Sequence, residues 1–146
     1  MGVQGKVWLC KPGFMNRGRG IEIFDTEKDI LEHLAKQRSG SSWIVQKYIE
    51  RPLLVQGRKF DIRTYVLVAP DKRVYMYKEG YIRTTCFEYK VDNLADKFIH
   101  LTNDAYQKTS ANFGKFEDAN KLSYPEFEVR IAPHYPVPNQ LLHPLQ

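Results

Sequence analysis

The sequence predicts an α+β fold in which a mostly antiparallel sheet is flanked by helices. The first observation is an alternation of apolar and polar residues with the period of a strand, repeated in several short segments. The second is the presence of turn residues at Pro70-Asp71 and Glu79-Gly80, which join neighbouring strands directly. The expected strands are Trp43–Tyr48, Lys59–Val68, Arg73–Tyr77 and Tyr81–Thr85.

The first part of the chain predicts a strand, a loop and a second strand. An apolar run over Val7–Cys10 is followed by a glycine-rich turn over residues 13–20 and by a second apolar run over Ile21–Phe24. The turn carries Arg17 and Arg19. A cationic loop between two strands is therefore expected near the N-terminus.

One short amphipathic helix follows this pair of strands. Thr26 with Asp29 three residues later resembles a capping box, and Ile30, Leu31 and Leu34 have helical spacing. The pattern ends at Ser39-Gly40-Ser41.

The end of the chain has a different character from the rest. Four prolines, at positions 133, 136, 138 and 144, leave no room for an uninterrupted helix or a central strand. We therefore divide the chain into one domain over residues 1–127 and a proline-rich, irregular tail over residues 128–146.

Composition and charge limit the kind of protein this is. The chain is 42% hydrophobic and 13% aromatic, which favours a folded core over disorder. Cys10 and Cys86 are typical of reduced thiols, and neither a signal sequence nor an apolar run long enough to cross a bilayer is present, so we expect a cytoplasmic protein without membrane contact. Residues 51–90 contain nine Lys or Arg against four Asp or Glu, which favours an anionic partner.

The stretch Lys59–Arg63 carries the clearest sign of a binding site. On a strand, Lys59, Asp61 and Arg63 share one face, while Phe60 and Ile62 share the other and are expected to face the core. Two cations around a carboxylate suit phosphate oxygens or a substrate carboxylate. The alternative is an ordinary solvated strand face, and this stretch alone does not decide between the two.

The loop over residues 12–20 is a second candidate. Its glycines let backbone amides approach phosphate oxygens, and Arg17 and Arg19 add positive charge. A Walker A motif is absent, so a hairpin lid over phosphates is favoured over a P-loop. Taken alone, the segment also fits an ordinary hairpin loop rich in Gly and Arg.

Several blocks, in this order, resemble the tubulin tyrosine ligase family of ATP-grasp amino-acid ligases. The resemblance covers roughly residues 7–127 and implies an ATP-grasp-like fold that is incomplete at both ends. The blocks are Trp8–Pro12, Arg17–Ile21, Trp43–Leu54, Lys59–Arg63, Tyr77–Thr84 and the His-Leu-Thr-Asn motif at residues 100–103.

The resemblance also implies roles for individual residues. Arg63 and Arg83 are implied to act on the transferring phosphate or on a substrate carboxylate, as catalytic residues. His100, by contrast, is interpreted as structural and is given no proton-transfer role. The residues implied to bind ATP are Lys11, Arg17, Gly18, Arg19, Gln46, Lys47, Tyr48, Ile49, Lys59, Asp61, Thr102 and Asn103.

The chemistry implied by the resemblance is amide-bond formation. ATP with Mg²⁺ converts a carboxylate of the acidic tubulin tail to an acylphosphate, and the amine of a free amino acid displaces the phosphate. The family's acidic metal-binding segment is not found in this chain, so no metal ligands are assigned and impaired ligation is expected. A location at the cytoskeleton or cilium follows from the same resemblance.

Two other classes of function stay open at this stage. One is a non-catalytic module that binds nucleotide or microtubules through its basic sheet. The other, less favoured, is nucleic-acid binding, because Tyr75, Tyr77 and Tyr81 interleave with basic residues. The amino acid that is joined also stays open: residues 112–117 look similar to the tyrosine-ligase branch, whereas residues 49–54 are shared with glycylases.

Overall fold

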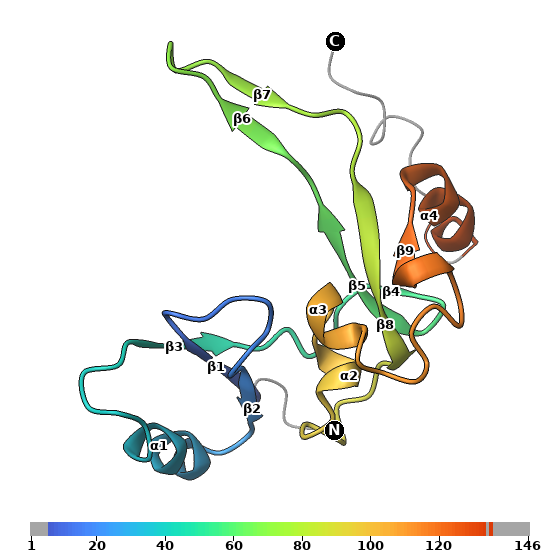
Figure 1. Cartoon of the computed structure of the whole chain (residues 1–146). Coiled ribbons are helices and arrows are strands. Elements are labelled where there is room, and N and C mark those ends of the chain that lie inside the picture. The colour runs from blue at the N-terminus through green and yellow to red at the C-terminus, as the bar shows by residue number, and fades with distance from the viewer. Residues whose placement is uncertain (1–5, 134, 136–146) are drawn as a thin grey trace.

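A computed structural model of the protein describes residues 6–133 and 135, and it has the expected α+β fold (Figure 1). Every strand pairing among these residues is antiparallel, which confirms the prediction from the alternating segments. The strands are β1 (Trp8–Pro12), β2 (Glu22–Phe24), β3 (Trp43–Lys47), β4 (Leu54–Val55), β5 (Arg58–Arg63), β6 (Val66–Val68), β7 (Val74–Met76), β8 (Tyr81–Glu88) and β9 (Lys121–Leu122). The helices are α1 (Glu27–Ala35), α2 (Lys97–His100), α3 (Asp104–Gln107) and α4 (Tyr124–Ile131), with a 3-10 turn η1 at Asp118–Asn120.

The N-terminal lobe is a three-stranded sheet in the order β2-β1-β3, with α1 beside it (Figure 1). The loop between β1 and β2 is the glycine-rich segment, as the sequence predicts. Helix α1 begins where its cap predicts, because the Thr26 hydroxyl accepts a hydrogen bond of 3.1 Å from the backbone N–H of Asp29. A small core forms beneath the sheet from Val7, Ile23 and Tyr48.

The second sheet has the order β4-β5-β8-β9 and supports most of the candidate site. Its strand β8 is buried on both faces: Ile82 packs in a core with Phe127 of α4, whereas Phe87 stacks on Phe98 of α2. Because alternate residues of a strand point to opposite faces, α2 and α4 cover opposite sides of this sheet. The helices therefore flank this sheet on both sides.

The long strand expected over residues 59–68 is two strands, β5 and β6, separated at Thr64-Tyr65. The opposing strand is interrupted at the same level by Gly80, where an added Cβ would lie 2.2 Å from the carbonyl oxygen of Arg63 and 2.3 Å from the Tyr124 hydroxyl. This crowding explains why only Gly fits and why the ladder breaks there. Beyond the break, β6 and β7 form an arm that projects from the body (Figure 1).

The expected boundary between the domain and the irregular tail, at residues 127–128, falls inside a helix. Helix α4 continues to Ile131, so residues 128–131 are helical rather than part of an irregular tail. A capping box explains its start, since Ser123 and Glu126 bond reciprocally to each other's backbone N–H groups. The prolines at 136, 138 and 144 lie outside the described residues. No helix in the part of the chain that the structure describes is long and apolar enough to cross a membrane.

Candidate functional site

Asp61 of β5 is the centre of a polar cluster that joins three elements. The Arg83 guanidinium on β8 donates two hydrogen bonds of 2.8 Å, one to each carboxylate oxygen of Asp61. Thr102, in the segment between α2 and α3, donates a further hydrogen bond to Asp61 Oδ2. The pairing follows from the register, which places Asp61 directly opposite Arg83 in the β5–β8 ladder. The carboxylate is therefore held by Arg83 rather than by the cations of its own strand.

Lys59 lies on the same face of β5 and is held by Tyr48. Its ammonium donates a 3.1 Å hydrogen bond to the Tyr48 hydroxyl oxygen and sits 4.4 Å from the centre of the Tyr48 ring. Burial lowers the pKa of Lys59 to about 8, although the nearby Asp61 carboxylate opposes the shift. Lys59 is thus a partly desolvated cation that gains from an added anionic neighbour.

His100 is buried and continues the hydrogen-bond chain from Tyr48. Its Nε2 lies 2.8 Å from the carbonyl oxygen of Asn93, which only accepts, so Nε2 carries the proton. Nδ1 therefore accepts the hydrogen bond of 2.8 Å from the Tyr48 hydroxyl. Burial lowers the pKa of His100, which keeps the ring neutral. This arrangement fits the structural role that the sequence suggests.

Ile62 and Arg63, at the end of β5, are both exposed. Ile62 is 54% exposed, so the prediction that it faces the core is wrong, whereas Phe60 does pack against Phe127 with ring centres 4.9 Å apart. Arg63 is exposed, with its guanidinium carbon 5.5 Å from the ring centre of Tyr65. Strand β5 therefore leaves the core after Asp61, where it turns into the arm.

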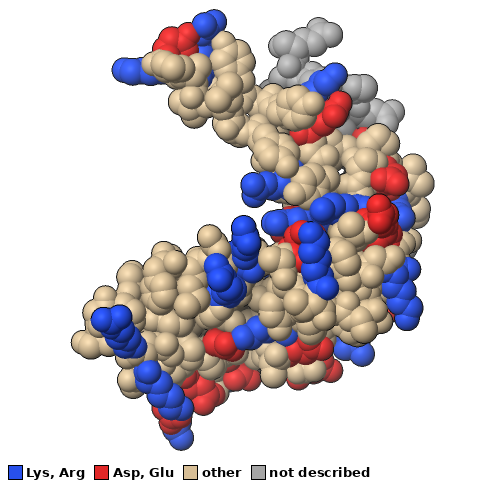
Figure 2. All heavy atoms as spheres, in the orientation of Figure 1, with Lys and Arg blue, Asp and Glu red and all other residues tan. Residues whose placement is uncertain are grey.

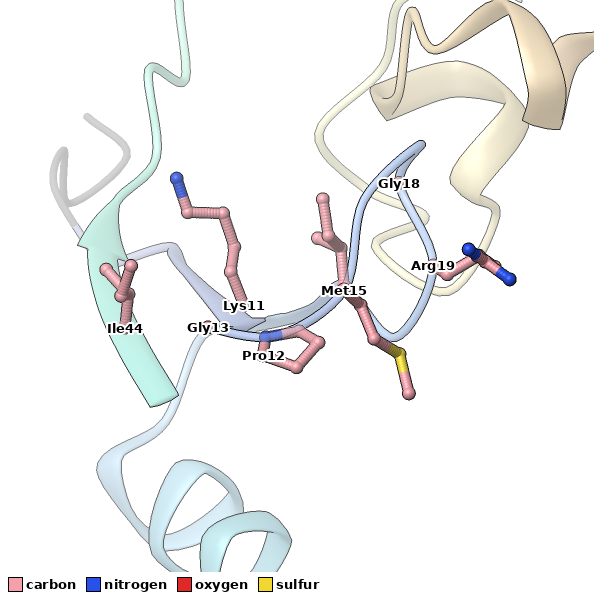
Figure 3. Close-up of a pocket in the computed structure, with 8 residues that line it drawn as sticks. Lys11, Pro12, Gly13, Met15, Gly18, Arg19 and Ile44 are labelled. Carbon is pink, nitrogen blue, oxygen red and sulfur yellow. The ribbon is translucent and has the colours of Figure 1, made fainter. Parts of the chain in front are cut away.

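A cavity of about 230 Å³ lies at the glycine-rich loop and is lined by Lys11, Gly18 and Arg19 among others (Figure 3). Lys11 and Arg19 point away from each other in Figure 3. The Lys11 ammonium donates to Gln46 Oε1, and the Arg19 guanidinium donates to Asn16 Oδ1 at 3.0 Å. Arg17 is exposed, with a positive φ of 60°. The loop thus presents cations on several sides rather than one converging set.

The segment Gln46–Ile49 connects the N-terminal lobe to the second sheet. Tyr48 points into the core, and its backbone N–H donates to the Val7 carbonyl at 3.0 Å. The Lys47 ammonium lies 4.6 Å from the ring centre of Trp8, and Ile49 is 69% exposed. Of the expected nucleotide residues in this segment, Gln46 reaches Lys11 and Tyr48 reaches Lys59.

The glycine-rich loop meets the His-Leu-Thr-Asn motif at one point. A Cβ added to Gly18 would lie 2.8 Å from Asn103 Oδ1, so the Gly18 backbone and the Asn103 side chain are in close contact. Asn103 directly follows Thr102, which binds Asp61. The predicted site residues of the loop and of the Asp61 cluster are therefore linked through residues 102–103.

The charge of this region suits an anion better than a cation. Figure 2 shows Lys and Arg side chains gathered along the hollow between the N-terminal lobe and the arm. Within residues 6–133 and 135, no group of three or more His, Cys, Asp or Glu side chains is placed to hold a metal ion. Asp61 is already engaged by Arg83 and Thr102. The charged side chains at Asp61 are therefore mainly cationic, with the one carboxylate already hydrogen-bonded.

A buried ion network beside the site was missed by sequence reasoning. Arg58, which is 1% exposed, donates two hydrogen bonds of 2.8 and 2.7 Å to Glu117, and Arg130 of α4 reaches the same carboxylate at 3.2 Å. Burial alone would raise the pKa of Glu117, but hydrogen bonds from Arg58 and Thr84 outweigh it and leave the pKa below its ordinary value. No spacing signal reveals a pair whose members are 59 residues apart.

The chain belongs to the tubulin-tyrosine ligase family, whose family model matches residues 2–135. It is 35% identical over 83% of its length to tubulin glycylase 3B of Tetrahymena thermophila. It is 37% identical over 81% of its length to a protein named probable tubulin polyglutamylase in Homo sapiens, and 40% identical over 73% to a tubulin monoglycylase of Homo sapiens. The chain spans 10%, 19% and 14% of the lengths of these relatives, respectively.

Proposed function

We propose that this chain carries the phosphate- and carboxylate-binding part of an ATP-dependent ligase that joins a free amino acid to an acidic tail of tubulin. The observation that carries the proposal is the Asp61–Arg83 pair with Lys59 on the same face of β5. The names of the relatives supply the acceptor, since they include glycylases and a polyglutamylase of tubulin.

Each group in this cluster has a physical task under the proposal. Asp61 fixes the plane of the Arg83 guanidinium by two-point hydrogen bonding, which leaves the remaining N–H donors for an anionic group. Lys59 adds a partly desolvated positive charge. An approaching phosphate or carboxylate raises the pKa of Lys59 and so favours its charged form. Lys11 and the backbone of the loop supply further donors at the loop cavity.

The reaction needs two anions to be brought together, which is why the basic hollow matters. ATP supplies the phosphoryl group that activates a carboxylate of the acceptor as an acylphosphate. The amine of the amino acid then forms the amide bond while phosphate leaves. The residues described above act by positioning and by charge neutralisation, so the barrier is lowered without a covalent bond to the protein.

The test is transfer of labelled glycine, glutamate or tyrosine to purified tubulin, each assayed separately with and without Mg-ATP. Because the family's acidic metal-binding segment is not found in this chain, we expect weak ATP-dependent label in tubulin, and none in tubulin whose acidic tails have been removed by limited proteolysis. Arg83→Ala is expected to abolish transfer. Arg63→Ala, at an exposed position, is expected to reduce transfer while leaving the thermal midpoint unchanged.

The three amino acids also decide specificity, because the relatives are named for glycine and glutamate whereas the family name refers to tyrosine. Transfer of one amino acid well above the others assigns the branch. Robust transfer would contradict the expected impairment, and ATP binding with no detectable transfer would favour a nucleotide-binding module. A folded chain that neither binds ATP nor transfers any amino acid would contradict the proposed site. A location at the cytoskeleton or cilium is part of the same proposal, and co-sedimentation with microtubules tests it.

A further inference from the structure

Gly18 lies at a point where the glycine-rich loop touches the rest of the molecule. Its φ of +78° is in the left-handed region, and an added Cβ would lie 2.8 Å from Oδ1 and 3.1 Å from Cγ of Asn103. Real Cβ atoms do not approach other atoms this closely, so the loop backbone rests directly against the Asn103 side chain. Figure 3 shows Gly18 on the blue loop, beside the pale tan ribbon of the helical segment.

Asn103 is itself held from the opposite side. Its carbonyl oxygen accepts hydrogen bonds from the backbone N–H groups of Tyr106 and Gln107 at 2.9 and 3.0 Å, which fix it at the start of α3. The preceding residue, Thr102, donates to Asp61. A displacement of Asn103 would therefore shift Thr102 and its hydrogen bond to Asp61. The position of Asp61 in turn fixes the Arg83 guanidinium.

A second contact fixes the same segment to the strand that follows the loop. Lys97, the first residue of α2, forms an ion pair of 2.5 Å with Glu22, the first residue of β2. The loop is thus bounded on one side by this ion pair and contacted at Gly18 by Asn103. Segment 97–103 therefore contacts the loop region at two points, the Lys97–Glu22 ion pair and the Gly18–Asn103 contact.

We propose that Asn103 is a positioning residue that seats the glycine-rich loop and couples the loop to the Asp61–Arg83 pair. A phosphate that draws the loop inward presses Gly18 against Asn103, and the Thr102–Asp61 hydrogen bond carries that constraint to Arg83. The coupling to phosphate rests on the proposed function, whereas the seating contact does not. Seating the loop is a role of Asn103 in addition to the ATP binding that the family resemblance implies for it.

The seating contact is tested without nucleotide by limited trypsin digestion, because Arg17 and Arg19 are exposed cleavage sites inside the loop. Cleavage after these residues, quantified by mass spectrometry, reports local opening of the loop. We expect Asn103→Ala to raise the cleavage rate by about tenfold while the thermal midpoint changes little, since the hydrogen bonds that Asn103 makes at the start of α3 come from its backbone carbonyl and are kept in Ala. An unchanged cleavage rate would overturn the proposal.

Gly40→Ala is the matched control for backbone strain. Gly40 has a φ of +79°, nearly that of Gly18, but nothing lies within 4 Å of its added Cβ. Gly18→Ala and Gly40→Ala therefore share the strain of a left-handed residue and differ in the clash with Asn103. We expect only Gly18→Ala to raise cleavage after Arg17 and Arg19.

A double variant shows whether the two residues act together. If Asn103 is the seat, Gly18→Ala combined with Asn103→Ala opens the loop no more than either single change, because the contact is already lost. Multiplied effects would mean that the two residues act independently and would overturn the proposal. This comparison needs no ATP, so it stays valid even if the chain binds no nucleotide.

Asn103→Asp separates seating from coupling. The Asp side chain has nearly the same shape and should leave the cleavage rate in the absence of nucleotide unchanged. Its negative charge next to the loop should weaken Mg-ATP binding by about tenfold, as measured by titration calorimetry. Protection of the loop by Mg-ATP in the parent, together with loss of that protection in Asn103→Ala, supports the coupling. Equal protection in both would overturn it.

Discussion

At the scale of single residues, the charged side chains of β5 bind partners on other elements rather than one another. Asp61 accepts hydrogen bonds from Arg83 on a neighbouring strand and from Thr102 in a distant segment. The strand period correctly predicts that Lys59 and Asp61 share one face. It does not predict the register between β5 and β8, which sets Arg83 opposite Asp61. The Tyr48–Lys59 contact was equally unpredictable, because it depends on how two sheets pack.

Lys59 gives a pH dependence whose sign follows from its burial. Under the proposed function the charged form of Lys59 binds phosphate, and the pKa of Lys59 is about 8 in the folded chain. The charged fraction therefore falls about tenfold between pH 7 and pH 9, and Mg-ATP affinity should weaken by a similar factor. Titration calorimetry across this range measures it. Lys59→Arg should bind ATP with an affinity that changes little over the same range, and a parallel decline in both proteins would contradict this account.

The same shift predicts how stability depends on pH. Because the pKa of Lys59 in the folded chain lies below the ordinary lysine value of 10.5, the unfolded chain binds more protons between about pH 8 and pH 10.5. The contribution of Lys59 to the free energy of unfolding should therefore rise as pH increases through this window. Urea denaturation of the parent and of Lys59→Met measures the difference, and a gap between them that does not change with pH would show that Lys59 is not desolvated.

At the scale of elements, the short strands and the capped helix α1 were predictable because their signals are local. The Thr26 cap and the alternating segments depend only on neighbours in the sequence. The break between β5 and β6 was not predictable, because it depends on the crowding around Gly80 in the folded chain. The burial of both faces of β8 was not predictable either, because it results from packing of α2 and α4. The helical residues 128–131 were missed because the downstream prolines dominated the pattern.

The buried Arg58–Glu117 pair is expected to be a main support of the second sheet. Replacing Glu117 by Gln removes one charge of a buried pair and leaves Arg58 and Arg130 facing each other, which should cost about 3–5 kcal/mol of unfolding free energy. Urea denaturation measures the loss. Glu32→Gln is the control, because Glu32 pairs with Lys28 at the surface and should change stability by less than about 1 kcal/mol. Similar losses for both variants would contradict the role given to the buried pair.

The arm formed by β6 and β7 exposes apolar side chains along both strands. Leu67 is 64% exposed and Val74 is 65% exposed. Replacing Leu67 by Lys should lower aggregation, measured by light scattering during heating, without lowering the thermal midpoint by more than a degree or so. Leu122→Lys, at a position 1% exposed, is the contrasting change and should prevent cooperative folding. A large loss of stability from Leu67→Lys would mean that the arm is packed.

At the scale of the whole molecule, Lys and Arg side chains gather along a hollow between the N-terminal lobe and the arm (Figure 2). The excess of Lys and Arg in residues 51–90 indicated an anionic partner, and the surface fits that interpretation. What the sequence could not supply is the contact of Gly18 with Asn103, because it joins segments 85 residues apart whose relative placement depends on the whole fold.

The most direct measurement of the central claim is the thermal midpoint of the purified chain with and without millimolar Mg-ATP, for the parent, Lys11→Ala and Lys28→Ala. A ligand that binds only the folded state raises the midpoint. Lys11 borders the loop cavity, whereas Lys28 lies on the exposed surface of α1 in the same lobe. The account predicts that Mg-ATP raises the midpoint of the parent and of Lys28→Ala but not of Lys11→Ala. No shift in a parent that melts cooperatively, or an equal shift in all three, would contradict a nucleotide site at this loop.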